Sequence, residues 1–325
     1  KGVKIFISSG ENDLYENIIH LVLARLPGAE EGTKGLSLFL VPKFLPNAKR
    51  NGVLCTKIEH KMGIHASATC ELTFGQNEEC IGYLIGEENL GMDAMFIMMN
   101  EERLMVALQG EAQANLAFEI AKDYAFSRKQ FGVDLTMHPD VRKMLLKMRA
   151  KARGLRALCM YAAQALDLHD SSELGVLIPI AKAYCSDQGF QIASEAVQVL
   201  GGYGYCSEYG VEQFIRDAKI AAIYEGTNGI QAMDLVMRKI LKDRGAALHA
   251  MVLKIKNTLE SLPSSFKEER TLFERALDDH QKIVEKISDL AGSKQFSLVL
   301  QKSTDILDFY ARLIVGWRLM AAAII

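Results

Sequence analysis

The chain has 325 residues, 49% of them hydrophobic, and a formal net charge of -2 at pH 7. This length is enough for two or three domains with a sizeable core, and the near-neutral charge without a cluster of basic residues argues against nucleic acid as the main partner. The six cysteines form no CxxC pair and the seven histidines are scattered, so we expect buried thiols in a reducing compartment and no metal site.

The first 90 residues contain short apolar runs that are rich in β-branched residues. These runs are "VKIFIS" (3–8), "IIHLVLA" (18–24), "LSLFLV" (36–41) and "CELTF" (70–74), with Gly, Pro and Asn gathered between them. Four or more short strands predict a small antiparallel sheet or barrel. Because the chain opens at Lys1 on a strand pattern and without Met, we also expect that an N-terminal part of the protein is missing.

After "GEENLG" (86–91) the apolar residues recur at steps of three and four, which is the helical period. Long helices are predicted over residues 92 to about 130, 139 to about 168, and about 175 to 200. A fourth helix is expected after Glu225, with Asn228 and Gln231 as a capping pair at its start. Helices of this length predict a bundle in which they pack lengthwise.

Amphipathic helical patterns continue beyond Gly245, over residues 246–261, 266–291 and 295–325. They predict an additional helical domain that is itself truncated. A helix that spans a membrane needs about 20 apolar residues, whereas the terminal "LIVGWRLMAAAII" is shorter and is broken by Arg318, so no transmembrane segment is predicted. The predicted fold class is therefore α+β, with a small antiparallel β-domain (1–90), an antiparallel four-helix bundle (91–244) and the additional truncated helical domain (245–325).

One glutamate, Glu225, stands in the break "IYEGTNGI" (223–230) between two helical patterns. Close to the start of a helix its anion would be favoured by about 0.3–1 kcal/mol, while burial would favour the neutral acid. A carboxylate balanced between these two effects can act as a general base near neutral pH. The alternative, from spacing alone, is an exposed loop glutamate that helps to start the helix.

Three further stretches contain residue types that can bind a ligand or move a proton. "QVLGGYGYC" (198–206) has glycines that permit close backbone approach to a ligand, although they also fit a helix C-cap. "SRKQFG" (127–132) has an arginine that can bind a pyrophosphate, although basic residues are common at helix ends. "NEERLMVA" (100–107) places Glu102 in mid-helix as a second possible base, and the alternative there is a surface ion pair.

Taken together, eight motifs stand in the order and at the spacings of a known family. They are "KIFISSG", "KMGIHASAT", "GEENLGM", "NEERLMVA", "SRKQFG", "AVQVLGGYGY", "RDAKI" and "YEGTNGI". Residues 1 to about 243 therefore resemble the middle β-domain and the C-terminal four-helix domain of the acyl-CoA dehydrogenase family. The tail after residue 245 resembles the extra helical region of longer members, including those that act on 3-methylthiopropanoyl-CoA.

The resemblance implies an enzyme that binds FAD and removes two hydrogens from Cα and Cβ of an acyl-CoA thioester. Glu225 would take the α-proton, and the β-hydrogen would leave as hydride to flavin N5. The backbone N–H of Glu225 and a flavin ribityl hydroxyl would stabilise the enolate, and donors of this kind are worth about 3–4 kcal/mol each. The residues matched to FAD are Phe6 (where tryptophan is commoner), Ser8, Arg128, Phe131, Gln198, Gly201, Gly202 and Thr227, and those matched to acyl-CoA are Asn100, Arg103 and Gly226.

Some relatives carry the base at the position of Glu102 and lack the loop glutamate. Both carboxylates are present here, and Glu225 is assigned as the base because the "YEGT" motif is intact. Two carboxylates that both face the flavin would repel, which would leave one of them partly protonated.

The resemblance also implies partners and a location. Electrons would pass to an electron-transferring flavoprotein. A homodimer or a dimer of dimers is implied because five of the matched residues would reach the FAD of a neighbouring subunit: Arg128, Phe131, Gln198, Gly201 and Gly202. We expect a cytoplasmic (bacterial) or mitochondrial matrix location, with the cytoplasm preferred. The alternatives are an acyl-CoA oxidase that uses O2, a non-catalytic flavoprotein of the same fold, and a purely helical interaction protein, which flavin absorbance would exclude.

Overall fold

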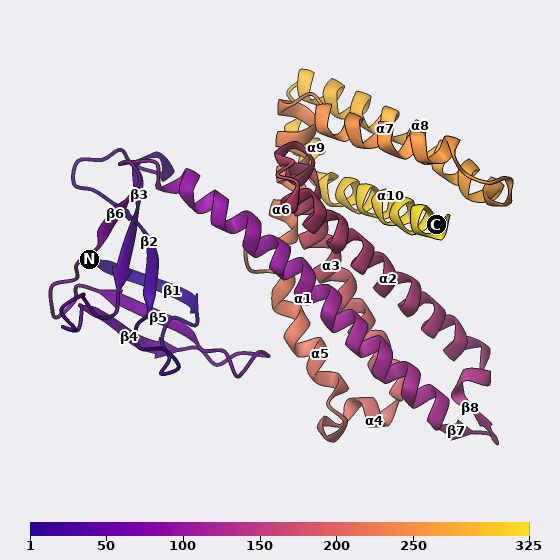
Figure 1. Ribbon diagram of the computed structural model, residues 1–325, viewed down its shortest axis with the longest axis horizontal. Coiled ribbons are helices and arrows are strands. Elements are labelled where there is room, and N and C mark those ends of the chain that lie inside the picture. Colours follow the sequence, from indigo (N-terminus) through magenta and orange to yellow (C-terminus); the bar gives the residue numbers. More distant parts are fainter. Residues whose placement is uncertain (325) are drawn as a thin grey trace. The chain divides into compact units, whose positions relative to one another are not determined.

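The computed structural model describes residues 1–324, and contacts between Cα atoms divide the chain into two compact units, Lys1–Glu101 and the residues from Glu102 onward. The first unit is mainly antiparallel β-structure and the second is mainly helical, which confirms the predicted α+β class (Figure 1). The predicted division near residues 90 and 244 stays a prediction. Ile325, the last residue of the expected helix over 295–325, lies outside the described residues.

The first unit consists of two three-stranded antiparallel sheets, whose strand orders are β1-β5-β4 and β2-β3-β6. The strands are β1 (Gly2–Ser8), β2 (Ile19–Arg25), β3 (Leu36–Pro42), β4 (Val53–Ile58), β5 (Thr69–Phe74) and β6 (Tyr83–Ile85). The four predicted strands are confirmed, and β4 and β6 are additional. The core of this unit consists of the alternating residues Cys70, Leu72 and Phe74 of β5, together with Val41 of β3 and Val53 of β4.

Strand β1 is irregular at Phe6. Lys4 pairs with Leu72 and Ile7 with Cys70, so two residues of β1 oppose one residue of β5. Phe6 has a φ of 56°, and 68% of its surface is exposed. A bulge of this kind bends the strand and turns a side chain to a new direction.

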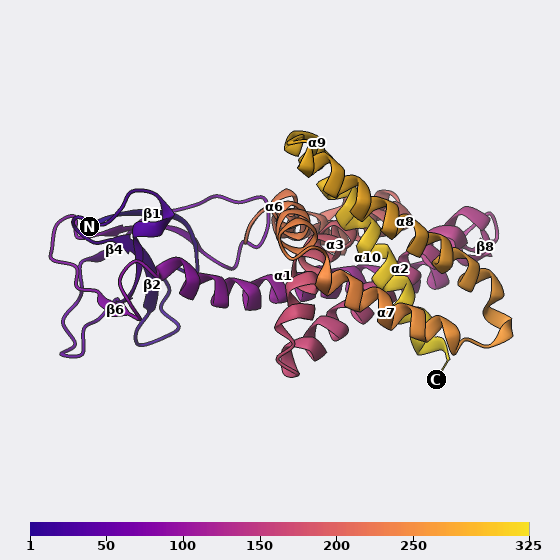
Figure 2. The same ribbon diagram turned by 90° about the horizontal axis from the view of Figure 1, so that it is seen from above.

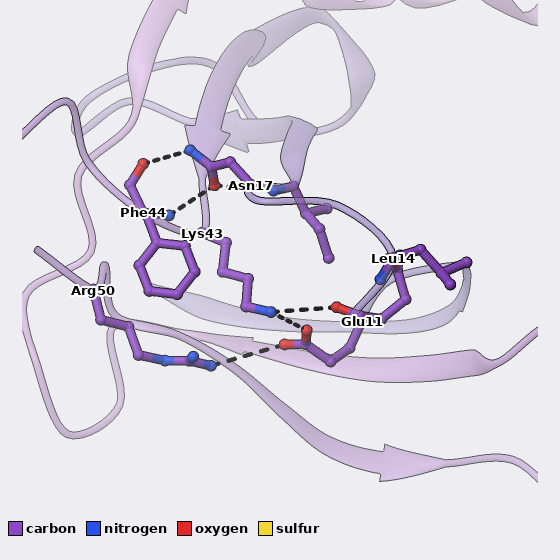
Figure 3. Close-up of polar contacts among 8 residues, drawn as sticks. Glu11, Leu14, Asn17, Lys43, Phe44 and Arg50 are labelled. Carbon is purple, nitrogen blue, oxygen red and sulfur yellow. Dashed lines mark hydrogen bonds and ion pairs between the residues drawn. The ribbon is translucent and has the colours of Figure 1, made fainter. Parts of the chain in front are cut away.

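The loop that follows β1 is fastened to the segment after β3 (Figure 3). Glu11 pairs with the ammonium of Lys43 and lies 3.8 Å from the guanidinium of Arg50. The amide of Asn17 donates to the carbonyl of Phe44 at 2.8 Å and accepts from its N–H at 2.9 Å. These contacts fix the path of the chain directly after Phe6 and Ser8.

Helix α1 (Gly91–Ser127) begins in the first unit and continues into the second, where the other helices follow. They are α2 (Pro139–Asp167), α3 (Ser171–Leu200), α4 (Gly202–Tyr205), α5 (Val211–Ala218), α6 (Asn228–Asp234), α7 (Ala246–Glu260), α8 (Lys267–Gly292), α9 (Phe296–Gln301) and α10 (Ser303–Ala323). Between α6 and α7 the chain is π-helical over Leu235–Lys242. The predicted helices are confirmed, except that Lys302 divides the last one into α9 and α10.

The C-terminal helices share the hydrophobic core of the bundle. Helix α10 contacts α2, α3 and α6, and it lies beside α2 (Figures 1 and 2). The Trp317 ring packs edge-on against Tyr161 of α2 at 5.4 Å, and its N–H donates to Thr258 of α7 at 2.8 Å. A Cβ added to Gly154 of α2 would lie 2.5 Å from the side chain of Val315, so α10 approaches α2 closely at that glycine.

Helices α1 and α3 also meet at two glycines. A Cβ added to Gly110 would lie 2.5 Å from the carbonyl oxygen of Cys185, and one added to Gly189 would lie 2.6 Å from the carbonyl oxygen of Gly110. The two backbones are therefore in direct contact, and this contact fixes the axial position of α1 relative to α3. In residues 1–324 no helix combines the length and the apolar character that crossing a bilayer requires.

Candidate functional site

Glu225 lies in a tight turn between the 3-10 segment η4 (Lys219–Ala222) and helix α6. Glu225 has a φ of 55° and Gly226 a φ of 84°, so two consecutive residues are left-handed. For a residue with a Cβ this conformation costs about 1–2 kcal/mol, and such strain persists only where the surroundings hold it.

Side chains from three helices hold the carbonyl oxygens of this turn. Arg103 of α1 donates from Nε to the carbonyl of Glu225 at 3.2 Å. Lys182 of α3 donates from Nζ to the carbonyl of Gly226 at 2.8 Å. Gln231 of α6 donates from Nε2 to both carbonyls at 3.3 Å. The backbone N–H of Glu225, in contrast, has no acceptor within residues 1–324.

The cap of helix α6 differs from the prediction. Thr227 is the N-cap, and its Oγ1 accepts from the N–H of Ile230 at 3.3 Å. The expected capping pair of Asn228 and Gln231 is therefore wrong. Asn228 turns inward and contacts Lys182, Ser186 and Ala183, because the buried polar groups of α3 need partners more than the exposed helix end does.

The surroundings of Glu225 have opposing effects on the pKa of its carboxyl. Burial of the half-buried carboxyl raises its pKa above the ordinary range, and the neighbouring charge of Glu102 raises it further. The cations of Arg103 and Lys182 lower it. A carboxyl with a raised pKa is a stronger proton acceptor, once ionised, than an ordinary glutamate. Glu102 itself is exposed on α1.

Other predicted residues come together at a second place in this unit. Arg128, Gly201 and Gly202 line one hollow together with Tyr203 and Cys206. The guanidinium of Arg128 lies 5.2 Å from the centre of the Tyr203 ring. Its buried Nε has no hydrogen-bond partner within residues 1–324, and a Cβ added to either glycine would meet nothing within 4 Å.

This hollow fits an anionic group such as the pyrophosphate of FAD. An unpaired buried guanidinium N–H is costly unless a ligand accepts from it, and the bare glycines leave room for a close approach. Phe131 and Gln198 are not among the residues that line the hollow. Phe131 is 93% exposed with a φ of 53°, and Gln198 is also exposed.

The remaining predicted residues lie on the surface of their own units. Phe6, Ser8 and Asn100 are exposed in the first unit, and Thr227 is exposed at the start of α6. Sequence reasoning missed Lys182 and the role of Gln231. The signal for Lys182 was present, because residues 178, 179, 185 and 186, three and four positions away on α3, are all buried, which places a cation within the apolar face.

Several known proteins are similar to this chain in sequence. Residues 89–241 match the family described as "Acyl-CoA dehydrogenase, C-terminal domain". The broad-specificity linear acyl-CoA dehydrogenase FadE5 of Mycobacterium tuberculosis is 41% identical, over 99% of this chain and 59% of the relative. The 3-methylmercaptopropionyl-CoA dehydrogenase of Ruegeria pomeroyi is 45% identical, over 75% of this chain and 45% of the relative.

The fold matches a solved structure as well. The crystal structure of Caenorhabditis elegans ACDH-11 in complex with C11-CoA aligns with 94% of this chain and 53% of that chain, at a TM-score of 0.85 and 26% identity. The chain spans about half the length of the curated relatives it matches.

Proposed function

Because the chain belongs to the acyl-CoA dehydrogenase family, we propose that the protein which carries it dehydrogenates an acyl-CoA thioester between Cα and Cβ, with Glu225 as the base that takes the α-proton. The observation that carries this proposal is the turn at Glu225. It joins a carboxyl with a raised pKa to a backbone N–H that has no acceptor in residues 1–324.

Each of these two groups has a task in the reaction. The proton beside a thioester is only weakly acidic, so its removal needs a base and a donor for the oxygen that becomes negative. The carboxylate of Glu225 supplies the base, and its own N–H supplies one donor, which can be worth about 3–4 kcal/mol. The left-handed backbone is held in advance by Arg103, Lys182 and Gln231, so little reorganisation is needed when the substrate binds.

FAD would supply the acceptor for the β-hydrogen as hydride. Thr227 would contact the adenosine half. Arg128, Gly201 and Gly202 would hold the anionic part of the FAD that is bound by a neighbouring subunit. In the first unit, Phe6 would lie against the ring, turned outward by the bulge of β1, with Ser8 near N5. Phe131 and Gln198, which are both exposed, would contact the FAD of the neighbouring subunit together with Arg128, in a homodimer or a dimer of dimers.

The proposed substrate class is linear acyl-CoA, with Asn100, Arg103 and Gly226 on the substrate side. Support for this class comes from the two relatives, whose names specify a linear acyl-CoA and a thioether acyl-CoA. We propose an electron-transferring flavoprotein as the electron acceptor and the bacterial cytoplasm as the location.

The test is a panel of acyl-CoA thioesters assayed on the complete polypeptide, loaded with FAD, with an artificial electron acceptor. We expect turnover with at least one straight-chain thioester. We also expect that little peroxide forms when the artificial acceptor is left out. Strong peroxide formation would indicate an oxidase instead. A flavin that no thioester in the panel reduces would refute the proposed activity.

A further inference from the structure

Helix α3 carries a lysine that is withdrawn from solvent. The side chain of Lys182 is 0% exposed, and no ion pair joins it to a carboxylate within residues 1–324. Burial of a cation is strongly unfavourable unless hydrogen bonds replace its water. The hydrogen-bond partners of Lys182 therefore show which groups compensate for the loss of its water.

The hydrogen bonds of Lys182 show where its charge acts. Its Nζ donates to the carbonyl of Gly226 at 2.8 Å and to Oδ1 of Asn228 at 3.0 Å. Asn228 in turn donates from Nδ2 to Oγ of Ser186 at 3.0 Å and to the carbonyl of Ala183 at 3.2 Å. The residues on both sides of Thr227 are thus tied to one turn of α3, directly after Glu225.

We propose that Lys182 is a positioning residue of the Glu225 turn, and that its ammonium both anchors the turn to α3 and favours the ionised form of the Glu225 carboxyl. The inference rests on the proposed function and extends it to a residue that does not touch the substrate. Arg103 anchors the preceding carbonyl from α1, so the base is held between two cations on two helices.

Charged groups on several elements surround Lys182. Asp187 of α3 and Glu225 favour its ammonium, and Arg103 of α1 disfavours it. Glu102 of α1 acts on Glu225 with the opposite sign to Lys182. Removal of the Lys182 charge leaves Glu225 with one cation against Glu102, so the carboxyl will hold its proton to higher pH.

The test compares Lys182→Met with Lys147→Met in the complete, FAD-loaded polypeptide. Lys147 is a matched control because it lies on α2, 55% exposed, and pairs with Glu195 at 2.6 Å. Two quantities are measured: the rate of flavin reduction by an acyl-CoA across pH, and hydrogen exchange of the backbone amides at residues 223–230.

Lys182→Met is expected to slow flavin reduction about 100-fold, as small misplacements of a catalytic group do. The acidic limb of its pH profile should move to higher pH, and exchange at residues 223–230 should become faster. Lys147→Met should match the wild type in both. Where Lys182→Met yields no folded protein, Lys182→Gln gives the same test of the pH limb, because it also lacks the charge.

Several outcomes would overturn the proposal. A slower rate with an unmoved acidic limb would mean that Lys182 acts on stability alone. Unchanged exchange at residues 223–230 would mean that it does not anchor the turn. If no acyl-CoA reduces the wild-type flavin, the proposed function fails first, while the exchange measurement still decides whether Lys182 holds the turn.

Discussion

Nε of Arg103 lies 3.2 Å from the carbonyl oxygen of Glu225, although 122 residues separate the two in sequence. The contact fastens the turn of Glu225 to helix α1, and it also brings the turn near Glu102, the neighbour of Arg103. One side chain therefore holds the base in place, while the next raises the pKa of that base. Mutation of each carboxyl in turn can distinguish the role of Glu225 from that of Glu102.

Glu225→Gln and Glu102→Gln should have very different effects on flavin reduction by acyl-CoA. Loss of a general base typically lowers the rate by about 10²- to 10⁴-fold, so Glu225→Gln should nearly abolish bleaching of the flavin. Glu102→Gln should stay within a few-fold of the wild type, because Glu102 acts on Glu225 only through its charge. The measurement is rapid-mixing absorbance of the flavin. A reversed pattern would make Glu102 the base.

Glu102→Gln should also shift the pH dependence of flavin reduction in a known direction. The base must be ionised, so the rate rises with pH through the pKa of Glu225. The charge of Glu102 raises that pKa, and its removal should move the acidic limb to lower pH. This shift is opposite to the one expected for Lys182→Met, and a Glu101→Gln variant provides the neighbouring control.

The stability of the protein should depend on pH through Lys182. Burial lowers the pKa of this lysine from 10.5 to about 8. Between pH 8 and pH 10.5 Lys182 is protonated in the unfolded chain and neutral in the folded chain. The contribution of Lys182 to the free energy of unfolding therefore increases with pH over this range, by about 3 kcal/mol in total. Below pH 8 both states hold the proton and the full cost of burial remains.

Urea unfolding of the wild type and of Lys182→Met, below pH 8 and above pH 10, measures this dependence. The wild type should gain stability relative to the variant as the pH rises. The same comparison with Lys147→Met should show no such gain. A constant difference between the wild type and Lys182→Met would show that Lys182 has an ordinary pKa.

Arg128→Met should weaken FAD binding. A hydrogen bond from a charged group contributes about 1.5–3 kcal/mol, which corresponds to a roughly tenfold to hundredfold rise in Kd. Lys129→Met is the control, because Lys129 is adjacent but exposed and does not line the hollow. Quenching of flavin fluorescence gives both affinities. An equal loss of FAD affinity in the two variants would indicate that positive charge in general attracts FAD, and that Arg128 makes no specific hydrogen bond to it.

Gly110→Ala should reduce both stability and activity. The added methyl would lie 2.5 Å from the carbonyl oxygen of Cys185, and overpacking of this kind costs about 1–3 kcal/mol. Because Arg103 lies two turns away on the same helix, a displaced α1 would also loosen its hold on Glu225. Gly292→Ala, whose methyl meets nothing within 4 Å, should leave thermal unfolding nearly unchanged.

Local patterns in the sequence predicted most of the elements, because helices and strands follow from apolar periodicity. The break at Glu225 was predicted in this way. Strand β4 was missed because "VLCTKI" lacks a long apolar run, and its pairing with β5 is a long-range contact. The contacts of Lys182 and Asn228 could not be predicted, since 46 residues separate the two in sequence and only the packing of α6 on α3 joins them.

The close approach of Gly154 to Val315 means that substitutions on α2 and on α10 depend on each other. A residue larger than glycine at that point on α2 would collide with α10, and without α10 the same surface would leave apolar side chains bare to water. The surfaces of α2 and α10 are thus sterically complementary at this position. Exchange of either one with a shorter family member would require the other to change with it.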